Sequence, residues 1–421
     1  MTGPKMPKQM RIHFRLLPFF CVFCAVGGHF LRGMEIPATT AEGYSVPQPR
    51  PTFAFPRDHG AHPDFKIEWW YITGHLFTTE AAPRRFGFQA TFFRNASPPD
   101  LPATHSSATG GAAAFGHDQI YLAHMALIDV GAGRFLHQER LNRAGWNASA
   151  ATNTLDVVNG DWSLAFASAG GPEKNTPKPS GQSLIDNMVL SGNGGDLMSP
   201  LVLKGGIRAE ARFAFTLTPA KPLVLFGDAG YSRKGSAPTA ASYYLTYSRL
   251  AAAGTLTLDG VDLSVSGTAW MDHEISSSQL DKNQVGWDWL SVQLNDGREL
   301  MFYALRNSDG SFDAASTLTW IDREGKATRA AYRWEPLTRW TSPHTGASYP
   351  QRIRLTTTDP ADGRERVLVV EPLQPDQELG GTLGGVTYWE GACRVLGSDG
   401  IETGSAYLEL TGYDKAVSVL R

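Results

Sequence analysis

Short runs of alternating apolar and polar residues recur along most of this chain, separated by residues that favour turns. Asp-Gly pairs at 259–260, 296–297 and 309–310 lie between such runs, and this dipeptide is typical of tight β-hairpins. Long runs with a helical repeat are almost absent. The pattern predicts an all-β protein, either a sandwich or a barrel. The clearest strand candidates are 86–93, 120–130, 211–217, 243–247, 254–265, 285–294, 299–305, 316–321, 351–356 and 406–410.

The run from Glu68 to Leu76 is the most informative of these strands, because it combines adjacent aromatic residues with ionisable ones. Successive side chains of a strand point to opposite faces. Both faces of this strand therefore carry large apolar surface and an ionisable group, which suits a strand that lines a cavity in a closed barrel or sandwich. The candidate ligand-binding residues are Glu68, Trp69, Trp70, Tyr71 and His75.

A second run of aromatic and ionisable residues lies in the later half of the chain, at 270–274, 286–289 and Tyr303. Histidine suits proton transfer near neutral pH, and tryptophan faces attract positive charge. An acid and a base in an apolar cavity could protonate or hydrate a carbon–carbon double bond. The candidates are His273 as proton carrier, Asp272 and Glu274 as its orienting groups, and Trp287, Asp288, Trp289 and Tyr303 at the pocket wall.

Two structural alternatives remain open for these motifs. On a strand, Asp272 and Glu274 share one face and His273 takes the other. As the first alternative, these three residues could form a structural network at a junction between domains. The Trp287-Asp288-Trp289 run could equally be a core element whose carboxylate caps backbone N–H groups.

The N-terminus is read as a targeting segment rather than as part of the fold. Four basic residues precede an apolar run at 16–28, which is typical of a secretory signal peptide and short for a membrane span. We predict a signal peptide over residues 1–30, and an uncleaved anchor is the alternative. The mature protein would then be periplasmic or extracellular, without a transmembrane span. Of its cysteines only Cys393 would remain, so no intrachain disulfide is expected.

Composition narrows the classes of function. The formal net charge of −3 argues against a nucleic-acid partner. The chain has no Gly-x-Ser-x-Gly nucleophile motif, no phosphate-binding glycine loop, and no His-Glu-x-x-His or cysteine pair. A zinc site built from His59, His62 and His75 is conceivable, but we predict neither a metal nor a cofactor.

The chain divides into two halves that each contain an aromatic strand with ionisable groups. The alanine-rich segment at 251–254 is the predicted joint, which places one domain at 44–247 and another at 248–421. Two stretches rich in Pro, Gly and Ser, at 96–118 and 168–182, are predicted to be long surface loops.

These motifs together resemble the AttH-like, carotenoid 1,2-hydratase-like (CrtC-type) family, in its exported bacterial branch. The resemblance covers nearly the whole mature chain and implies two lipocalin-like antiparallel β-barrel domains packed together. In the hydratases, a His that follows Asp and a downstream Tyr are implicated in the active site, matching His273 and Tyr303. The motifs that carry the resemblance are 58–63, 68–71, 74–76, 231–235, 270–274, 286–289, 297–300, 388–391 and 407–413.

The chain departs from the hydratase pattern at two places. Ile275 stands where the hydratases carry Trp, and Ala304 and Leu305 follow Tyr303 where they carry Asp. These differences argue against hydration of carotenoids specifically.

The sequence therefore predicts an exported lipocalin-like protein with an apolar, aromatic-lined pocket for a lipid, terpenoid or similar hydrophobic molecule. If it is an enzyme, the expected chemistry is acid–base hydration or cyclisation of a double bond. One alternative is a non-catalytic periplasmic carrier associated with an ABC exporter, as the resemblance implies for some members. The other is a secreted hydrolase.

Overall fold

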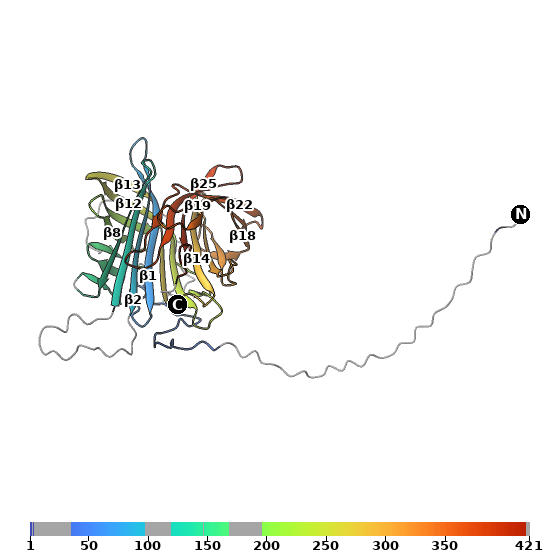
Figure 1. The fold of residues 1–421 in the computed structure, drawn as a ribbon, viewed down its shortest axis with the longest axis horizontal. Coiled ribbons are helices and arrows are strands. Elements are labelled where there is room, and N and C mark those ends of the chain that lie inside the picture. Colours follow the sequence, from blue (N-terminus) through green and yellow to red (C-terminus); the bar gives the residue numbers. More distant parts are fainter. Residues whose placement is uncertain (2, 4–34, 97–118, 146, 168–195, 418–421) are drawn as a thin grey trace. The chain divides into compact units, whose positions relative to one another are not determined.

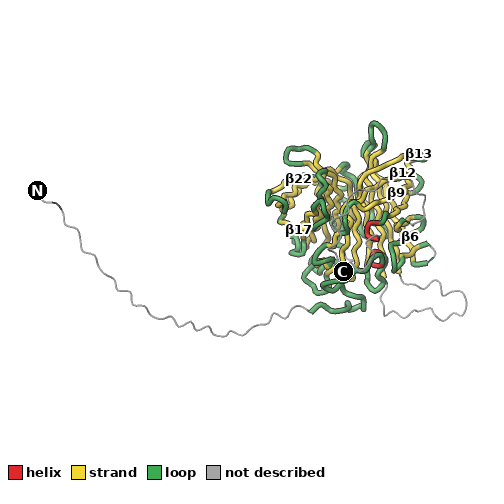
Figure 2. The backbone as a smooth tube through the Cα atoms, turned by 180° about the vertical axis from the view of Figure 1, so that it is seen from behind, coloured by secondary structure: helices red, strands yellow, loops and turns green. Residues whose placement is uncertain are grey.

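Strands make up almost all of the regular structure, as the tube in Figure 2 shows. The computed structural model describes residues 1, 3, 35–96, 119–145, 147–167 and 196–417. Within these residues the helical segments are short 3-10 turns, η1 (Arg57–His59) and η3 (Asp196–Met198). The predicted all-β class is confirmed. The leader at 1–30, apart from residues 1 and 3, and the predicted loops at 97–118 and 168–182 lie outside the described residues.

The first sheet has 13 strands in the order β4-β3-β2-β1-β13-β12-β9-β8-β7-β6-β5, with β10 and β11 paired to β12. Its two ends approach each other where Asn159, at the end of β6, donates a hydrogen bond to the Tyr121 carbonyl on β3 (3.2 Å). The sheet is therefore a nearly closed antiparallel barrel. Its strands are β1 (Ile67–Thr78), β2 (Arg85–Ala96), β3 (Gln119–Asp129), β4 (Arg134–Arg143), β5 (Ala148–Ala150), β6 (Asp156–Asn159), β7 (Trp162–Phe166), β8 (Leu201–Ile207), β9 (Ala211–Pro219), β10 (Val224–Leu225), β11 (Tyr231–Arg233), β12 (Ala241–Leu258) and β13 (Val261–Ser278).

The second sheet has 10 strands in the order β17-β16-β15-β14-β25-β24-β22-β21-β18, with β23 paired to β24. Its end strands β17 and β18 follow each other directly in the chain, so this sheet also curls into a nearly closed barrel. A small hairpin of β19 and β20 accompanies it. The strands are β14 (Gln284–Leu294), β15 (Glu299–Asn307), β16 (Thr317–Ile321), β17 (Ala327–Ala330), β18 (Tyr332–Pro336), β19 (Arg339–Thr341), β20 (Ser348–Pro350), β21 (Ile353–Thr358), β22 (Glu365–Pro372), β23 (Glu378–Leu379), β24 (Tyr388–Leu396) and β25 (Glu402–Thr411).

The alanine-rich segment at 251–254 does not separate the two barrels. It lies inside β12, which continues to Leu258, turns at Asp259-Gly260 and returns as β13. Both turn residues have positive φ (50° and 82°), the conformation of the hairpin turn that Asp-Gly favours. Ala252 is buried whereas Ala251 and Ala253 are exposed, which is ordinary strand alternation. The first barrel therefore extends to Ser278, beyond the predicted joint, because the longest hairpin of the fold belongs wholly to it.

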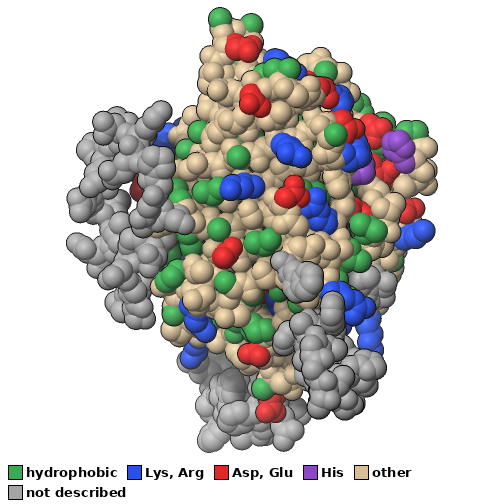
Figure 3. All heavy atoms as spheres, turned by 90° about the vertical axis from the view of Figure 1, so that its left-hand side faces the viewer, with side chains coloured by type: hydrophobic (Ala, Val, Ile, Leu, Met, Phe, Trp, Pro, Cys, Tyr) green, Lys and Arg blue, Asp and Glu red, His purple; other side chains and the backbone are tan. Residues whose placement is uncertain are grey.

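Each barrel has its own apolar core, and a third apolar cluster lies between the barrels. Figure 1 shows the two barrels side by side, and β1, β2 and β12 of the first contact β25, β24 and β14 of the second, respectively. Gly87 on β2 lies so close to β24 that an added Cβ would sit 2.4 Å from the Cβ of Ala392. Only glycine permits this approach at that position. Figure 3 shows a face on which basic and acidic side chains are interspersed.

A buried carboxylate from the second barrel anchors two cations from the first. Glu299 is fully buried, and its two oxygens contact Lys221 Nζ and Arg249 Nε, each at 2.6 Å. Arg249 lies at a register shift in β12 between Tyr247 and Leu250. Such a bulge redirects a side chain, and here it lets Arg249 reach the second barrel.

A second polar network lies inside the first barrel and binds the segment before β1. Glu68 Oε1 accepts hydrogen bonds from His62 Nδ1 and His273 Nε2, each at 2.8 Å, and Arg94 Nε donates to Glu68 Oε2 at 2.9 Å. Burial alone would raise the pKa of Glu68, but hydrogen bonds from His273 and His62 outweigh burial and hold it well below its usual range. Burial would likewise lower the pKa of His62, yet Asp58 and Glu68 raise it to about 9. His62 is therefore protonated at neutral pH.

Removing the Glu299 carboxylate, which joins the two barrels, should destabilise the protein strongly. Glu299→Ala leaves Lys221 and Arg249 facing each other without a counter-charge, and breaking a buried ion pair costs about 3–5 kcal/mol. Urea and thermal unfolding should show a large loss of stability. The control is Glu365→Ala in the exposed pair with Arg333, whose loss should cost less than about 1 kcal/mol. Equal effects of the two changes would contradict a stabilising role for Glu299.

The His62 contacts predict a loss of stability at alkaline pH. The pKa of His62 is raised in the folded protein, so its contribution is complete below its unfolded value near 6.5 and disappears as the pH rises through about 9. The difference in melting temperature between wild type and His62→Gln should therefore shrink between those two pH values. A difference that stays constant over this range would show that His62 is not protonated in the folded protein.

Candidate functional site

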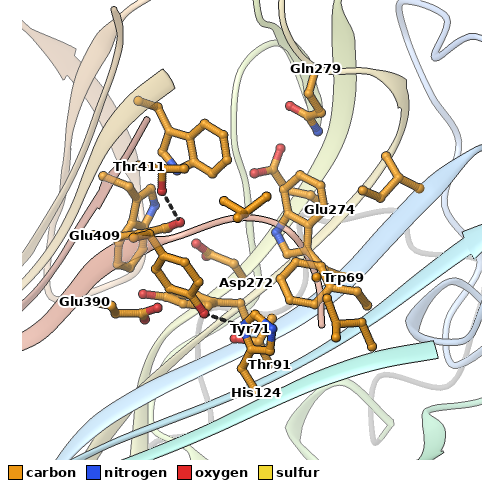
Figure 4. Close-up of a pocket in the computed structure, with 18 of the residues that line it drawn as sticks. Trp69, Tyr71, Thr91, His124, Asp272, Glu274, Gln279, Glu390, Glu409 and Thr411 are labelled. Carbon is orange, nitrogen blue, oxygen red and sulfur yellow. Dashed lines mark hydrogen bonds between the residues drawn. The ribbon is translucent and has the colours of Figure 1, made fainter. Parts of the chain in front are cut away.

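A cavity of about 410 Å³ lies between the two barrels. Its walls come from the outer faces of β1, β2, β3, β12 and β13 on one side and of β14, β15, β24 and β25 on the other. The cavity therefore lies outside both barrel interiors, in the space where the sheets face each other. Figure 4 shows Trp69 and Tyr71 of the first barrel across from Glu390, Glu409 and Thr411 of the second.

Strand register explains why these particular residues meet. In antiparallel sheets, residues directly opposite each other on paired strands point to the same face. The first sheet therefore presents two rows to the cavity, and so does the second. The rows are His124–Thr91–Tyr71–Asp272 and Leu122–Phe93–Trp69–Glu274–Tyr244 on the first sheet, and Tyr303–Trp289–Glu409–Glu390 and Leu305–Trp287–Thr411–Tyr388 on the second.

The cavity surface is mostly apolar and aromatic. The rings of Tyr71 and Trp289, from opposite barrels, pack edge to face with centroids 5.0 Å apart. Toward the outside the lining includes Ile120, Leu141 and Leu383, which are 38%, 45% and 50% exposed. Exposed large aliphatic side chains at the rim of a cavity are typical of a site that admits apolar molecules.

Asp272 is a buried carboxyl group held by three donors. The hydroxyls of Tyr244 and Thr246 and the indole N–H of Trp270 donate hydrogen bonds to it at 2.7, 2.6 and 2.7 Å. Burial raises the pKa of Asp272 to about 7, and these three hydrogen bonds only partly oppose that rise. Trp289 Nε1 donates to the Tyr244 hydroxyl at 2.9 Å, which links the second barrel to this group.

Glu390 and Glu409 face each other directly across β24 and β25. Like charges at such positions repel, so the two carboxyl groups cannot easily ionise together. Burial, and then the charge of Glu409, raise the pKa of Glu390 well above its usual range. Burial raises the pKa of Glu409 to about 7, against hydrogen bonds from Thr411 and Trp287. Glu390 therefore favours its neutral form, and both forms of Glu409 are populated near pH 7.

One cation lines the cavity in the described part of the chain. Lys234 Nζ pairs with Glu274 at 2.8 Å and lies 4.6 and 4.4 Å from the ring centroids of Tyr244 and Tyr303. Burial alone would lower the pKa of Lys234, but Glu274 outweighs burial and raises it. Lys234 stays charged, and its charge is committed to Glu274.

The structure brings together six of the predicted site residues. They come from three strands, β1, β13 and β14, and each lines the cavity. They are Trp69, Tyr71, Asp272, Glu274, Trp287 and Trp289, with Tyr303 as a seventh whose hydroxyl donates to the Arg233 carbonyl at 3.2 Å.

Four other predicted residues lie elsewhere, because strand alternation sends them to the opposite faces. His75 shares the face of Trp69 and Tyr71 but lies farther along β1, beyond the cavity lining. His273, Trp70 and Glu68 point into the first barrel, where the His273 and Trp70 rings stack with centroids 4.8 Å apart. His273 is therefore separated from Asp272 and Glu274 by the sheet itself. His75 contacts the Ala406 carbonyl at 2.9 Å. Asp288 faces the second barrel and pairs with Arg306 at 2.9 Å.

His62, Glu68 and His273 are the described residues whose possible metal-ligating atoms lie within 4.8 Å of one another. Both ring nitrogens that face Glu68 are at hydrogen-bond distance from the same carboxylate oxygen, and Arg94 occupies the other oxygen. The three side chains thus already serve as one another's partners. Of the three histidines considered as zinc ligands from the sequence, only His62 belongs to this cluster. His59 contacts the Tyr247 hydroxyl, and His75, on β1, contacts the Ala406 carbonyl of the second barrel.

Sequence reasoning missed the carboxyl groups that the second barrel contributes, Glu390 and Glu409, and the cation Lys234. Each glutamate stands between apolar residues in its strand, two positions from a tyrosine on the same face. The sequence signal for these residues was an ionisable side chain at a position where strand alternation predicts burial. Its meaning depends on which sheet face is covered, and that is a property of the assembled barrels.

In chemical terms the site offers neutral and readily ionised carboxylic acids in an apolar, aromatic cavity. A carboxylic acid with a pKa near 7 is suited to proton donation at neutral pH. Tryptophan and tyrosine rings stabilise positive charge over their faces.

Within the described residues, no helix is long and apolar enough to traverse a lipid bilayer.

Comparison with known proteins agrees with this architecture. A solved structure of a Nitrosomonas europaea protein assigned to AttH is 33% identical, covers 87% of this chain and 98% of its own, and has a TM-score of 0.68. Kievitone hydratase from Nectria haematococca has a TM-score of 0.59, covering 90% of this chain and 96% of its own, but its 12% identity shows the fold alone. Among curated proteins there is no match.

The AttH-like family matches residues 46–413, which span both barrels and every strand that lines the cavity. The chain belongs to the AttH-like family.

Proposed function

We propose that the cavity between the barrels binds a hydrophobic small molecule, such as a lipid or terpenoid, and that its carboxylic acids act on a carbon–carbon double bond. The observation that carries this proposal is the set of buried carboxyl groups of Asp272, Glu390 and Glu409 in an otherwise apolar, aromatic cavity. A site that only held an apolar molecule would not need such groups, since burying a carboxyl group is costly.

Glu409 is the best-placed proton donor. It lines the cavity, its Oε1 accepts from Thr411 at 3.0 Å, and its pKa near 7 keeps the acid form populated at neutral pH. Proton transfer to one carbon of the double bond would leave a carbocation at the other. The faces of Trp69, Trp287 and Trp289 would then stabilise that charge.

The cation can be resolved in two ways that both conserve atoms and charge. Water can add to it and return a proton to the Glu409 carboxylate, which is hydration. A second double bond of the same molecule can capture it before a proton returns to the carboxylate, which is cyclisation. Both reactions regenerate the acid.

A non-catalytic carrier is the second candidate, and the apolar rim formed by Ile120, Leu141 and Leu383 favours it, because uptake and release need only such an opening. A carrier could hand its ligand to an ABC exporter. A hydrolase that uses Asp272, His273 and Glu274 as one catalytic group has less support, since His273 lies on the other face of β13.

We further propose that the protein acts outside the cytoplasm, in the periplasm or beyond the cell. The support is the basic and apolar N-terminal segment, which is typical of a secretory signal.

Binding of a hydrophobic probe should depend on the cavity walls. Replacing Trp287 with Ala removes one aromatic wall, and binding of farnesol, a terpenoid alcohol, should weaken by about tenfold because aromatic side chains dominate such contacts. Fluorescence titration and native mass spectrometry measure this. Trp340→Ala, on the small β19–β20 hairpin, is the matched control and should bind as wild type does. Absence of binding by wild type to farnesol and to other lipids and terpenoids would remove the ligand-binding proposal.

Turnover should require the acid form of Glu409. If the protein converts an unsaturated ligand, Glu409→Gln should retain binding but lower kcat by about 10²–10⁴-fold, the usual contribution of a general acid. Wild-type kcat should fall as the pH rises through about 7, where the acid form of Glu409 is lost. Liquid chromatography coupled to mass spectrometry detects hydration as a gain of one water and cyclisation as an isomer of unchanged mass with a different retention time.

The control for this experiment is Glu402→Gln on the same strand, which pairs with Arg85 at the surface. Its kcat should equal that of wild type. A ligand recovered chemically unchanged from both wild type and Glu409→Gln would favour the carrier.

A further inference from the structure

Several polar atoms that line the cavity have no hydrogen-bond partner in the described part of the chain. Glu390 is the clearest case, because it is 1% exposed and neither of its carboxyl oxygens makes a hydrogen bond of good geometry, although the Tyr71 hydroxyl lies close enough to influence its pKa. Buried polar groups are nearly always hydrogen bonded. The Tyr71 hydroxyl can satisfy only one position of the Glu390 carboxyl group, so Glu390 keeps room for a further partner that the described residues do not supply. The cavity-lining atoms without a hydrogen bond of good geometry are Tyr71 Oη, Gln279 Nε2, Glu390 Oε1 and Oε2, and His124 Nε2, which lies 3.5 Å from Glu139 Oε1.

The charges around the cavity indicate what that partner is. Lys234 is the one cation among the cavity-lining residues that the structure describes, and it is paired with Glu274. Burial lowers the pKa of His124 to about 3, so this histidine is neutral. Three carboxyl groups, those of Asp272, Glu390 and Glu409, therefore face the cavity without a cation. Figure 4 shows Glu390 and Glu409 together on one side and Asp272 between them and Trp69.

We infer that the cavity selects a positively charged, otherwise apolar molecule, an amine whose ammonium group faces Glu390, Glu409 and Asp272. This inference rests on the proposed function, because it assumes that the cavity binds a small molecule. An ammonium group would donate hydrogen bonds to the orphaned Glu390 oxygens, and charge-assisted bonds of this kind are stronger than neutral ones. The surrounding tryptophan and tyrosine rings would add cation–π attraction.

The same arrangement disfavours other head groups. A carboxylate ligand would meet three acids with no free cation nearby, and an alcohol would form only neutral hydrogen bonds with Glu390. An ammonium compound also resembles the carbocation that protonation of a double bond would create. An enzyme binds the transition state more tightly than the substrate, so such an amine should bind more tightly than a neutral analogue.

Binding of an amine should also release a proton. At about pH 6 the acids with pKa values near 7 are largely neutral, and a bound cation favours their ionised forms. Titratable groups from several elements surround the expected position of the ammonium group. They are Asp272 and Glu274 on β13, Glu390 on β24, Glu409 on β25 and Lys234, with the neutral side chains of His124 and Tyr71 opposite. A neutral ligand would leave their protonation unchanged.

The test is calorimetric titration of the mature protein with n-decylamine, n-decanol and n-decanoate at about pH 6, in two buffers that differ in ionisation enthalpy. Decylamine should bind at least about tenfold more tightly than decanol, as expected of a charge-assisted contact, and should release about one proton. Glu390→Gln, which is isosteric and cannot ionise, should remove most of this preference. If that variant fails to fold, Glu409→Gln gives the same comparison.

Glu402→Gln, outside the cavity, should keep the preference for the amine. Decanol or decanoate binding as tightly as decylamine, or amine binding without proton release, would overturn the inference and leave the proposed function standing. Failure of all three probes and of farnesol to bind would instead contradict the proposed function. A preference for decylamine that persists in both Glu390→Gln and Glu409→Gln would overturn the assignment of these carboxyl groups.

Discussion

The constraint on which this structure depends is that β1 and the second half of β13, residues 269–277, are buried on both faces. Their inner faces complete the core of the first barrel, and their outer faces form the wall that meets the second barrel. A strand ordinarily separates a core from solvent, so one face can be polar without cost. Over these residues neither face reaches bulk water, and every ionisable group among them needs a partner, a neutral form or a cavity.

The protein satisfies this requirement differently on the two faces. On the inner face, Glu68 remains ionised because two histidines and Arg94 surround it. On the outer face, Glu274 contacts Lys234, whereas Asp272 accepts hydrogen bonds only from neutral donors and burial raises its pKa. The difference follows from the number of cations that each face receives. The Glu68 network, in which every charge has a counter-charge, is suited to stabilising the fold. The Asp272 carboxyl group, which has no cation as partner, is suited to binding or proton transfer.

The second barrel adds further carboxyl groups without a cation to the outer side. Its cavity face places Glu390 directly opposite Glu409, a pairing that two ionised carboxylates would destabilise. The barrels are nevertheless fastened tightly by Glu299, which receives Lys221 and Arg249 from the first barrel. The ion pairs at one part of the interface can thus offset the cost of burying carboxyl groups at another.

The sequence by itself determined the all-β class, the hairpin at Asp259-Gly260 and the alternation of Glu68 to Leu76, because turn chemistry and the two-residue period of a strand are local properties. It also singled out Trp69, Tyr71, Asp272 and Trp289, since buried aromatic and ionisable residues are unusual together. Only the tertiary structure decided which face of each strand borders the cavity. That decision separated His273 from Asp272, and it added Glu390 and Glu409 from strands more than a hundred residues along the chain. Alternation assigns residues to two faces, but what covers each face depends on packing between the barrels, which no local pattern contains.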